Sequence, residues 1–152
     1  MFLFKGEYNH QLDAKNRIRI PAKLKAELGV GYSITRGVDK CLYIIPKEEM
    51  DKLTSKLEQF DMYDAEKQKG IRSVLRLAYD PEEDNQGRIV LTEKLRSYAG
   101  IEKDIVFLGV GNRIEIWDEK EYEKYNENEN FDNIVSSLVK LRKRCLNSNI
   151  FR

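Results

Sequence analysis

Basic residues alternate with apolar ones in a short segment near the N-terminus, where Arg17 and Arg19 flank Ile18, with Lys15 before them and Lys23 after them. Alternation with a period of two is typical of a β-strand, so the two arginines share one face and Ile18 lies on the other. An exposed row of such cations can bind phosphates, and arginine can also donate two hydrogen bonds to a guanine edge. The alternative is that the cations only keep a strand face solvated.

The sequence shows no set of residues typical of a catalytic site. His10 is the only histidine, so no second one can complete a nucleophile and base pair with it. Gly109-Val110-Gly111 lacks the spacing of a phosphate-binding loop and is predicted to be a hairpin turn. Cys41 and Cys145 lack metal-ligand spacing. We therefore predict that the protein is not an enzyme, has no catalytic residues and uses no metal and no cofactor.

The basic segment belongs to a signature that occurs twice, about 70 residues apart, which is the pattern of an internal repeat. The first copy is Asp13-Ala14-Lys15-Asn16-Arg17-Ile18-Arg19-Ile20-Pro21, and the second is Asp84-Asn85-Gln86-Gly87-Arg88-Ile89-Val90-Leu91-Thr92. Each runs from a polar turn into an alternating strand and then a short helix closed by glycine. Asn16 and Gly87 hold the same position, and both residue types tolerate positive φ in a tight turn.

The outward faces of the two copies differ in charge. Lys15, Arg17 and Arg19 of the first copy are replaced by Gln86, Arg88 and Val90 in the second. Only the first arginine is repeated, as Arg88, and the acidic residues Glu82, Glu83 and Asp84 that precede it could hold it in a structural ion pair. We therefore expect the first copy to dominate any contact with nucleic acid.

Strands and helices around the signatures are predicted from hydrophobic periodicity and turn residues. Strands are expected at Tyr32–Arg36, Cys41–Ile45, Ile105–Leu108 and Arg113–Trp117, and helices at Lys47–Lys56 and Asp64–Ala78. The order in each copy is that of a βαββα module, and roughly 45 residues are too few to bury its apolar strands alone. We therefore expect the two modules to share one hydrophobic core as a pseudo-dimer.

Composition limits the class of protein. The chain has 152 residues, of which 41% are apolar and 35% charged, as in a soluble globular protein. It has no apolar run long enough to span a membrane, and Met1–Lys5 is too short for a signal peptide, so the cytoplasm is the expected compartment. The net charge of +1 argues against a uniformly basic protein. Between Asp13 and Glu27, however, five positive residues accompany two negative ones.

The C-terminal part contains a second group of cations. Asn126–Asn130 is predicted to be a linker, and Phe131–Cys145 an amphipathic helix with Ile134, Leu138 and Leu141 on one face. Its cations are Lys140, Arg142, Lys143 and Arg144. The helix could be an accessory arm that binds DNA or a partner, or its cations could simply stabilise the end of the helix.

Six ordered segments together resemble the MraZ family of bacterial transcriptional regulators, and the resemblance covers most of Met1 to about Tyr125. The segments are Gly6–His10, Asp13–Pro21, Thr35–Leu42, Asp84–Leu91, Tyr98–Asp104 and Gly109–Trp117. The family's Asp-x-x-x-Arg element matches Asp13 with Arg17 and Asp84 with Arg88. Asn16, where glycine is usual, and Thr92, where proline is common, depart from the pattern without changing the expected fold.

The resemblance implies an α+β fold of two tandem βαββα-type swapped-hairpin (AbrB-like) modules, which form a pseudo-dimeric β-barrel-like core with peripheral helices. The expected parts are residues 1–60 for the first module with its following helix, 61–78 for a connecting helix, 79–125 for the second module, and 126–152 for the linker and C-terminal helix.

The implied function is sequence-specific binding of double-stranded DNA at repeats in the promoter of a division and cell-wall gene cluster. A ring-shaped homo-oligomer associated with the nucleoid would carry it out, without a membrane or a small-molecule substrate. The residues expected to bind DNA are Lys15, Arg17, Arg19, Lys23 and Arg88. The alternative is an antitoxin-like AbrB-fold module that acts through protein partners.

Overall fold

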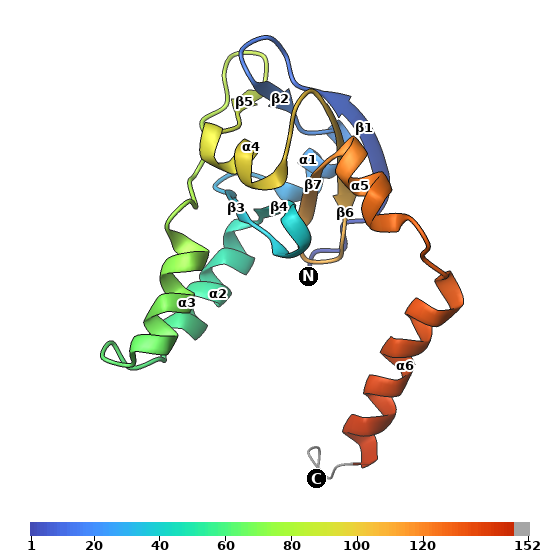
Figure 1. The fold of residues 1–152 in the computed structure, drawn as a ribbon. Coiled ribbons are helices and arrows are strands. Elements are labelled where there is room, and N and C mark those ends of the chain that lie inside the picture. The colour runs from blue at the N-terminus through green and yellow to red at the C-terminus, as the bar shows by residue number, and fades with distance from the viewer. Residues whose placement is uncertain (148–152) are drawn as a thin grey trace. The chain divides into compact units, whose positions relative to one another are not determined.

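The computed structural model describes residues 1–147, and its chain divides into two compact units, Met1–Tyr122 and a second unit that begins at Glu123 (Figure 1). The first half of the first unit contains β1 (Glu7–Gln11), β2 (Arg17–Arg19), α1 (Ala22–Leu28), β3 (Ser33–Arg36), the 3-10 turn η1 (Val38–Lys40), β4 (Leu42–Ile45), α2 (Lys47–Glu58) and α3 (Ala65–Leu75). Its second half contains β5 (Arg88–Val90), α4 (Glu93–Ala99), β6 (Asp104–Gly109) and β7 (Ile114–Asp118). The chain continues into α5 (Glu119–Asn126) and α6 (Phe131–Asn147).

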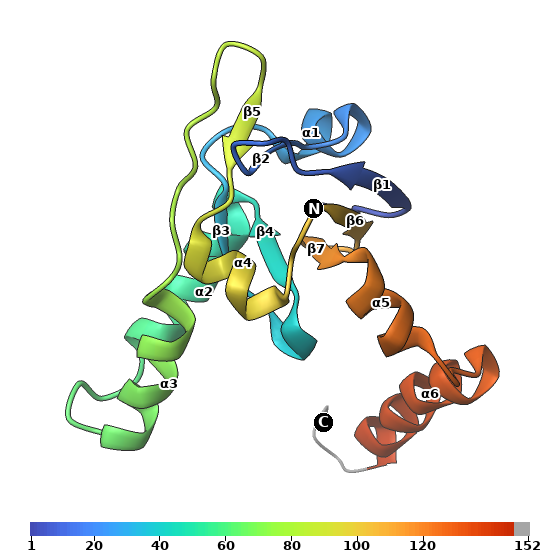
Figure 2. The ribbon, with the colours of Figure 1, turned by 45° about the horizontal axis from the view of Figure 1, so that its top comes forward.

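Strands from the two halves of the sequence are interleaved in one antiparallel sheet with the order β1-β6-β7-β4-β3. A separate two-stranded ribbon pairs β2 with β5, and Figure 2 shows these strands side by side. The fold is therefore mixed α+β, as predicted. The expected barrel-like core is not found, because the described strands form an open sheet and a ribbon and do not close into a barrel.

One hydrophobic core contains residues of both sequence copies. It is built from one face of the sheet, the inward residues of the ribbon and the apolar sides of α1 and α4. Ile18 and Ile89 are each 1% exposed, and Leu24 and Leu95, which belong to the same core, are 3% and 0% exposed. Sharing of one core is expected for modules that are too small to bury their apolar strands separately.

Each of the two short helices α1 and α4 is followed by a glycine, as the signature predicts. Pro21 directly precedes α1, and Gly29 follows it with φ 72°. Thr92 caps α4 by accepting a hydrogen bond from the Leu95 N–H at 3.4 Å, and Gly100 follows with φ 63°. Different residues therefore fix the same helix boundaries in the two copies.

The strand that leads into the signature differs between the copies. In the first copy it is the five-residue strand β1, which pairs with β6. In the second copy only Tyr79 pairs, in an isolated bridge with Ile34. Pro81 follows two residues later and has no N–H to donate to a ladder, which accounts for the shortened strand.

The two helices after β4 deviate from the predicted bounds at one end. The helix α2 extends to Glu58, and α3 ends at Leu75 rather than Ala78. The hydroxyl of Thr35 donates to the Val74 carbonyl at 2.8 Å, which fixes the end of α3 to β3.

The second unit contains the helix α6, which forms where the amphipathic pattern predicts it. Ile134 and Leu138 on its apolar face are 45% and 67% exposed. The predicted basic cluster begins at Lys140, and its side chains lie outside the described residues. Among the described residues, no helix has the length and apolar character needed to cross a membrane.

Candidate nucleic-acid interface

The ribbon of β2 and β5 brings the two signatures into direct contact. Ile18 pairs with Ile89 at its centre, and Arg19 lies opposite Arg88 in the register. Because Ile18 and Ile89 point into the core, their neighbours on both strands point outward. Three of these four outward residues are arginines, and the fourth, Val90, is 53% exposed. The ribbon therefore presents a narrow strip of arginine side chains, a shape that can enter a DNA groove.

The turn before β2 is held by one carboxylate. Asp13 accepts hydrogen bonds from the backbone N–H of Lys15 at 2.8 Å and of Arg17 at 2.9 Å, and from the Arg17 side-chain Nε at 2.7 Å. Asn16 adopts φ 59° within this turn. The aspartate thus shapes the loop and fixes the arginine at the same time.

The turn before β5 repeats this arrangement. Asp84 accepts from the backbone N–H of Gln86 and of Arg88, each at 2.9 Å, and from the Arg88 Nε at 2.8 Å. Gly87 takes the place of Asn16 with φ 73°. The positive φ predicted for both positions is confirmed.

The two turns also contact each other through their charges. The Arg17 Nη1 lies 3.8 Å from the Asp84 carboxylate, and the Arg88 Nη1 lies 3.9 Å from that of Asp13. We call these four residues the ion-pair cluster. Its side chains are 24–33% exposed, so it is half-buried between the copies. Hydrogen bonds from the Arg17 backbone lower the pKa of Asp13, and those from the Arg88 backbone lower the pKa of Asp84 to about 2.

The sequence-predicted site residues fall into two groups. The alternation predicts Arg17 as an outward cation and leaves a structural ion pair open for Arg88, whereas both arginines occupy equivalent places in the ion-pair cluster. Arg17 is paired, contrary to the prediction, because Asp13 lies four residues before it, just as Asp84 lies four residues before Arg88. Two aspartates and two arginines leave the cluster without net charge.

The remaining predicted residues are exposed and carry the excess positive charge. Lys15, Arg19 and Lys23 have no carboxylate within ion-pair distance among the described side chains. Lys15 lies in the first turn, Arg19 on the ribbon and Lys23 at the start of α1. These three cations are therefore available to an anionic ligand.

One neighbouring cation is used for a structural contact instead. Lys25 lies 3.1 Å from the Glu83 carboxylate, which also accepts a hydrogen bond from the Tyr32 hydroxyl at 2.9 Å. Glu83 is thus occupied by the first half of the chain and does not hold Arg88.

Sequence reasoning missed one exposed cation that lies outside the ribbon and outside the proposed DNA contacts, Lys94 on α4. It stands in the second copy where Lys23 stands in the first, at the start of α4, and it is exposed. Among the described side chains it has no ion-pair partner. Continuing the alignment of the repeats from the signature into the helix would have identified it.

Comparisons with known proteins agree with the repeat. A family model described as "MraZ protein, putative antitoxin-like" matches residues 3–71 and again residues 74–142. The second match continues beyond Tyr125 and into α6, which is farther than the resemblance in the sequence motifs extends.

Curated relatives match nearly the whole chain. A protein of Alkaliphilus oremlandii is 40% identical over 141 residues, which cover 91% of this chain and 99% of the relative. One of Clostridium beijerinckii is 43% identical over 137 residues, covering 90% of this chain and 96% of the relative. One of Clostridium tetani is 41% identical over 140 residues, covering 91% and 99%. All three carry the name transcriptional regulator MraZ and not the name of an enzyme, in agreement with the prediction that this chain is not an enzyme.

Proposed function

Since this chain belongs to the MraZ family, we propose that it is a transcriptional regulator that binds double-stranded DNA through the ribbon of β2 and β5. The observation that carries the proposal is the strip of arginine side chains on that ribbon, together with the unpaired cations Lys15, Arg19 and Lys23 on and beside it. A two-stranded ribbon is narrow enough for the major groove, and lysine and arginine side chains supply the phosphate contacts that dominate affinity.

Each residue has a distinct role in this proposal. Lys15, Arg19 and Lys23 contact phosphates, because they are exposed and have no ion-pair partner among the described side chains. Arg17 and Arg88 are oriented by Asp13 and Asp84 through Nε.

Two aspartates on a DNA-binding surface need an explanation, because each would repel phosphate if it were isolated. Here each is neutralised by its own arginine and by backbone N–H groups. Asp13 and Asp84 are therefore positioning residues that hold the guanidinium groups in place before DNA arrives. This prearrangement lowers the entropy lost on binding.

The proposal extends to the finer features that the family resemblance implies. Strands of opposite copies pair with each other, β1 with β6 and β2 with β5, which supports an AbrB-like arrangement of exchanged hairpins. The proposed parts are residues 1–60, 61–78, 79–125 and 126–152. A ring-shaped homo-oligomer in the cytoplasm, at the nucleoid, would place several ribbons on successive repeats of a promoter in a division and cell-wall gene cluster, which multiplies weak contacts into avidity.

A second candidate function is an antitoxin-like module that acts through a protein partner, and the description of the matching family favours it. A protein partner would bind without the steep dependence on salt that phosphate contacts produce. The same titration therefore separates the two functions.

The test is fluorescence anisotropy of a labelled duplex from the gene's own promoter, measured with full-length protein at several salt concentrations. Arg19→Ala is expected to weaken binding by about tenfold and to reduce the slope of log K against log salt by about one unit. The control is Lys52→Ala, which removes the same charge from α2, a helix that is not part of the ribbon. Identical affinity and slope for wild type and Arg19→Ala would overturn the proposed site.

A further inference from the structure

A recess opens in the first unit between the end of α3, the strand β3 and the helix α4. Its volume is about 560 Å³, which is within the range of small-molecule binding sites. The lining residues are Arg36, Arg76, Leu77, Glu93, Lys94, Ser97 and Tyr98. The recess uses neither strand of the ribbon, so the DNA-binding proposal does not account for it.

The charges in this recess are unbalanced. Arg36, Arg76 and Lys94 face a single acidic residue, Glu93. None of the three cations has a carboxylate within ion-pair distance among the described side chains. Like charges gathered in a concave surface raise its potential and attract anions.

Arg36 is held in place before any ligand binds. Its guanidinium donates to the Ser73 carbonyl and lies 5.5 Å from the centre of the Tyr98 ring. The Tyr98 hydroxyl in turn donates to the Gly37 carbonyl at 2.6 Å, which fixes the ring. Arg36 is half-buried by these contacts, and they leave further guanidinium N–H groups for an anion.

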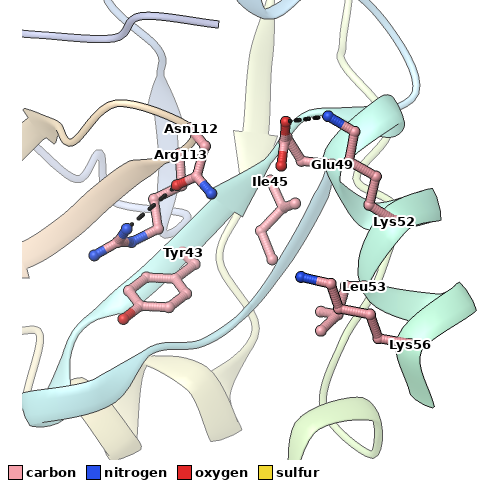
Figure 3. Close-up of a pocket in the computed structure, with 8 residues that line it drawn as sticks. All are labelled: Tyr43, Ile45, Glu49, Lys52, Leu53, Lys56, Asn112 and Arg113. Carbon is pink, nitrogen blue, oxygen red and sulfur yellow. Dashed lines mark hydrogen bonds and ion pairs between the residues drawn. The ribbon is translucent and has the colours of Figure 1, made fainter. Parts of the chain in front are cut away.

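A second recess on the same unit provides a contrast (Figure 3). It has a volume of about 330 Å³ and is lined by Tyr43, Ile45, Glu49, Lys52, Leu53, Lys56, Asn112 and Arg113. Figure 3 shows Lys52 paired with Glu49, at 3.2 Å, and Arg113 pairs with Glu115 at 2.9 Å. Two of its three cations are therefore neutralised by neighbours, whereas none is in the larger recess.

We propose that the recess formed by Arg36, Arg76 and Lys94 is an anion site that binds a phosphate group. Arginine can donate two parallel hydrogen bonds to phosphate oxygens, and lysine adds a mobile point charge. The phosphate has two possible sources, a small phosphorylated compound or the backbone of DNA that extends beyond the ribbon. The position of Lys94 does not distinguish the two sources. It lines the recess, where a small compound would bind, and it also closely follows β5, the ribbon strand proposed to contact DNA.

The first arm of the test measures binding of inorganic pyrophosphate to full-length protein by isothermal titration calorimetry at constant ionic strength. The double variant Arg76→Ala, Lys94→Ala is expected to bind at least about tenfold more weakly, since it removes two charged hydrogen-bond donors from the recess. The control is Lys52→Ala, Lys56→Ala, which removes the same charge from the smaller recess and is expected to leave binding unchanged.

The second arm repeats the promoter titration with a short duplex and with one extended on both sides. If DNA supplies the phosphate, the double variant lowers the salt slope by up to about two units on the extended duplex alone. If a small compound supplies it, pyrophosphate binding depends on the recess while both DNA slopes stay unchanged. Arg76→Gln, which keeps the size and removes the charge, replaces the double variant if circular dichroism shows that the latter is unfolded.

Two outcomes would overturn the anion site. One is that neither pyrophosphate binding nor the DNA slope distinguishes the recess variant from its control. The other is that light scattering shows a changed subunit number for the recess variant, which would make the recess a contact between copies of the chain. Since the ribbon is intact in these variants, failure of the anion site would leave the effect of Arg19→Ala in place and would not bear on the proposed function.

Discussion

The two signature segments, residues 13–20 and 84–91, are alike toward the core and unlike toward solvent. Ile18 and Ile89 are equally buried, and the two preceding aspartates accept the same set of hydrogen bonds. On the outside, Arg19 of the first copy corresponds to Val90 of the second. Burial and loop hydrogen bonds restrict the inner positions in both copies, whereas the outer positions can diverge and give one copy most of the charge.

The largest expected effect tests whether the inner faces are equivalent. Ile18→Ala and Ile89→Ala should each lower the free energy of unfolding by about 2–5 kcal/mol, because each leaves a cavity at the centre of the shared core. Urea denaturation measures both, and the exposed Val90→Ala should change stability by less than about 0.5 kcal/mol. Full tolerance of one isoleucine substitution beside a large loss from the other would show that the two halves do not share the core equally.

The ion-pair cluster gives the next largest effect. Arg17→Ala and Arg88→Ala should reduce DNA affinity by similar factors, about tenfold each, since both arginines are oriented by an aspartate and each loss leaves a carboxylate near the phosphates. Anisotropy titration measures this, with Lys52→Ala as the control. A strong loss for Arg17→Ala with none for Arg88→Ala would restore the asymmetric interpretation of the sequence.

Adding a positive charge to the second copy tests whether charge on the outer face accounts for the difference in DNA binding between the copies. Val90→Arg places an arginine where the first copy has Arg19, on an exposed position that the core does not constrain. DNA affinity should rise by up to about tenfold and the salt slope should steepen by about one unit. Val90→Gln is the uncharged control, and equal gains from both variants would show that charge is not the cause.

The turns should differ by a smaller amount. Gly87→Ala should destabilise the protein by about 1 kcal/mol, because its φ of 73° is unfavourable for a residue with a Cβ although no atom would clash with it. Asn16→Gly should be neutral or slightly stabilising for the same reason. Thermal denaturation compares the two, and a large loss for Asn16→Gly would mean that the asparagine side chain makes the turn.

The smallest effect is the dependence of stability on pH. The pKa of Asp84 is about 2 in the folded protein and 3.8 ordinarily, so its contribution is complete above pH 3.8 and is lost as the pH falls toward 2. Asp84→Asn should reduce that part of the acid-induced loss, and Asp13→Asn should act in the same direction. Urea midpoints at several acidic pH values measure this, with Asp51→Asn on α2 as the control. An unchanged pH profile for both variants would contradict the paired roles of the aspartates.

Local features of the fold were predictable because they depend on neighbours in the chain. The positive φ of Asn16 and Gly87, the caps at Thr92 and Gly100, and the burial of Ile18 and Ile89 all follow from residue type and spacing. The shortened second leading strand could have been recognised at Pro81.

The candidate site was predicted less completely. Charge counting identified Lys15, Arg19 and Lys23, which the structure leaves exposed and unpaired among the described side chains. Arg17 was predicted to be a free cation, because a count of charged residues takes no account of the carboxylate that each cation pairs with. Lys94 was missed because the second copy has less positive charge overall.

The sequence by itself determined the duplication, the turns and the alternation, since these are encoded at short range in backbone preferences and apolar periodicity. Only the tertiary structure decided that strands of opposite copies pair and that the Arg17 guanidinium comes within 3.8 Å of the Asp84 carboxylate. It also brought Arg36, Arg76 and Lys94 to one recess. The physical reason is that contacts between segments distant in the sequence depend on how the two copies pack around their shared core. The backbone preferences of single residues do not specify that packing.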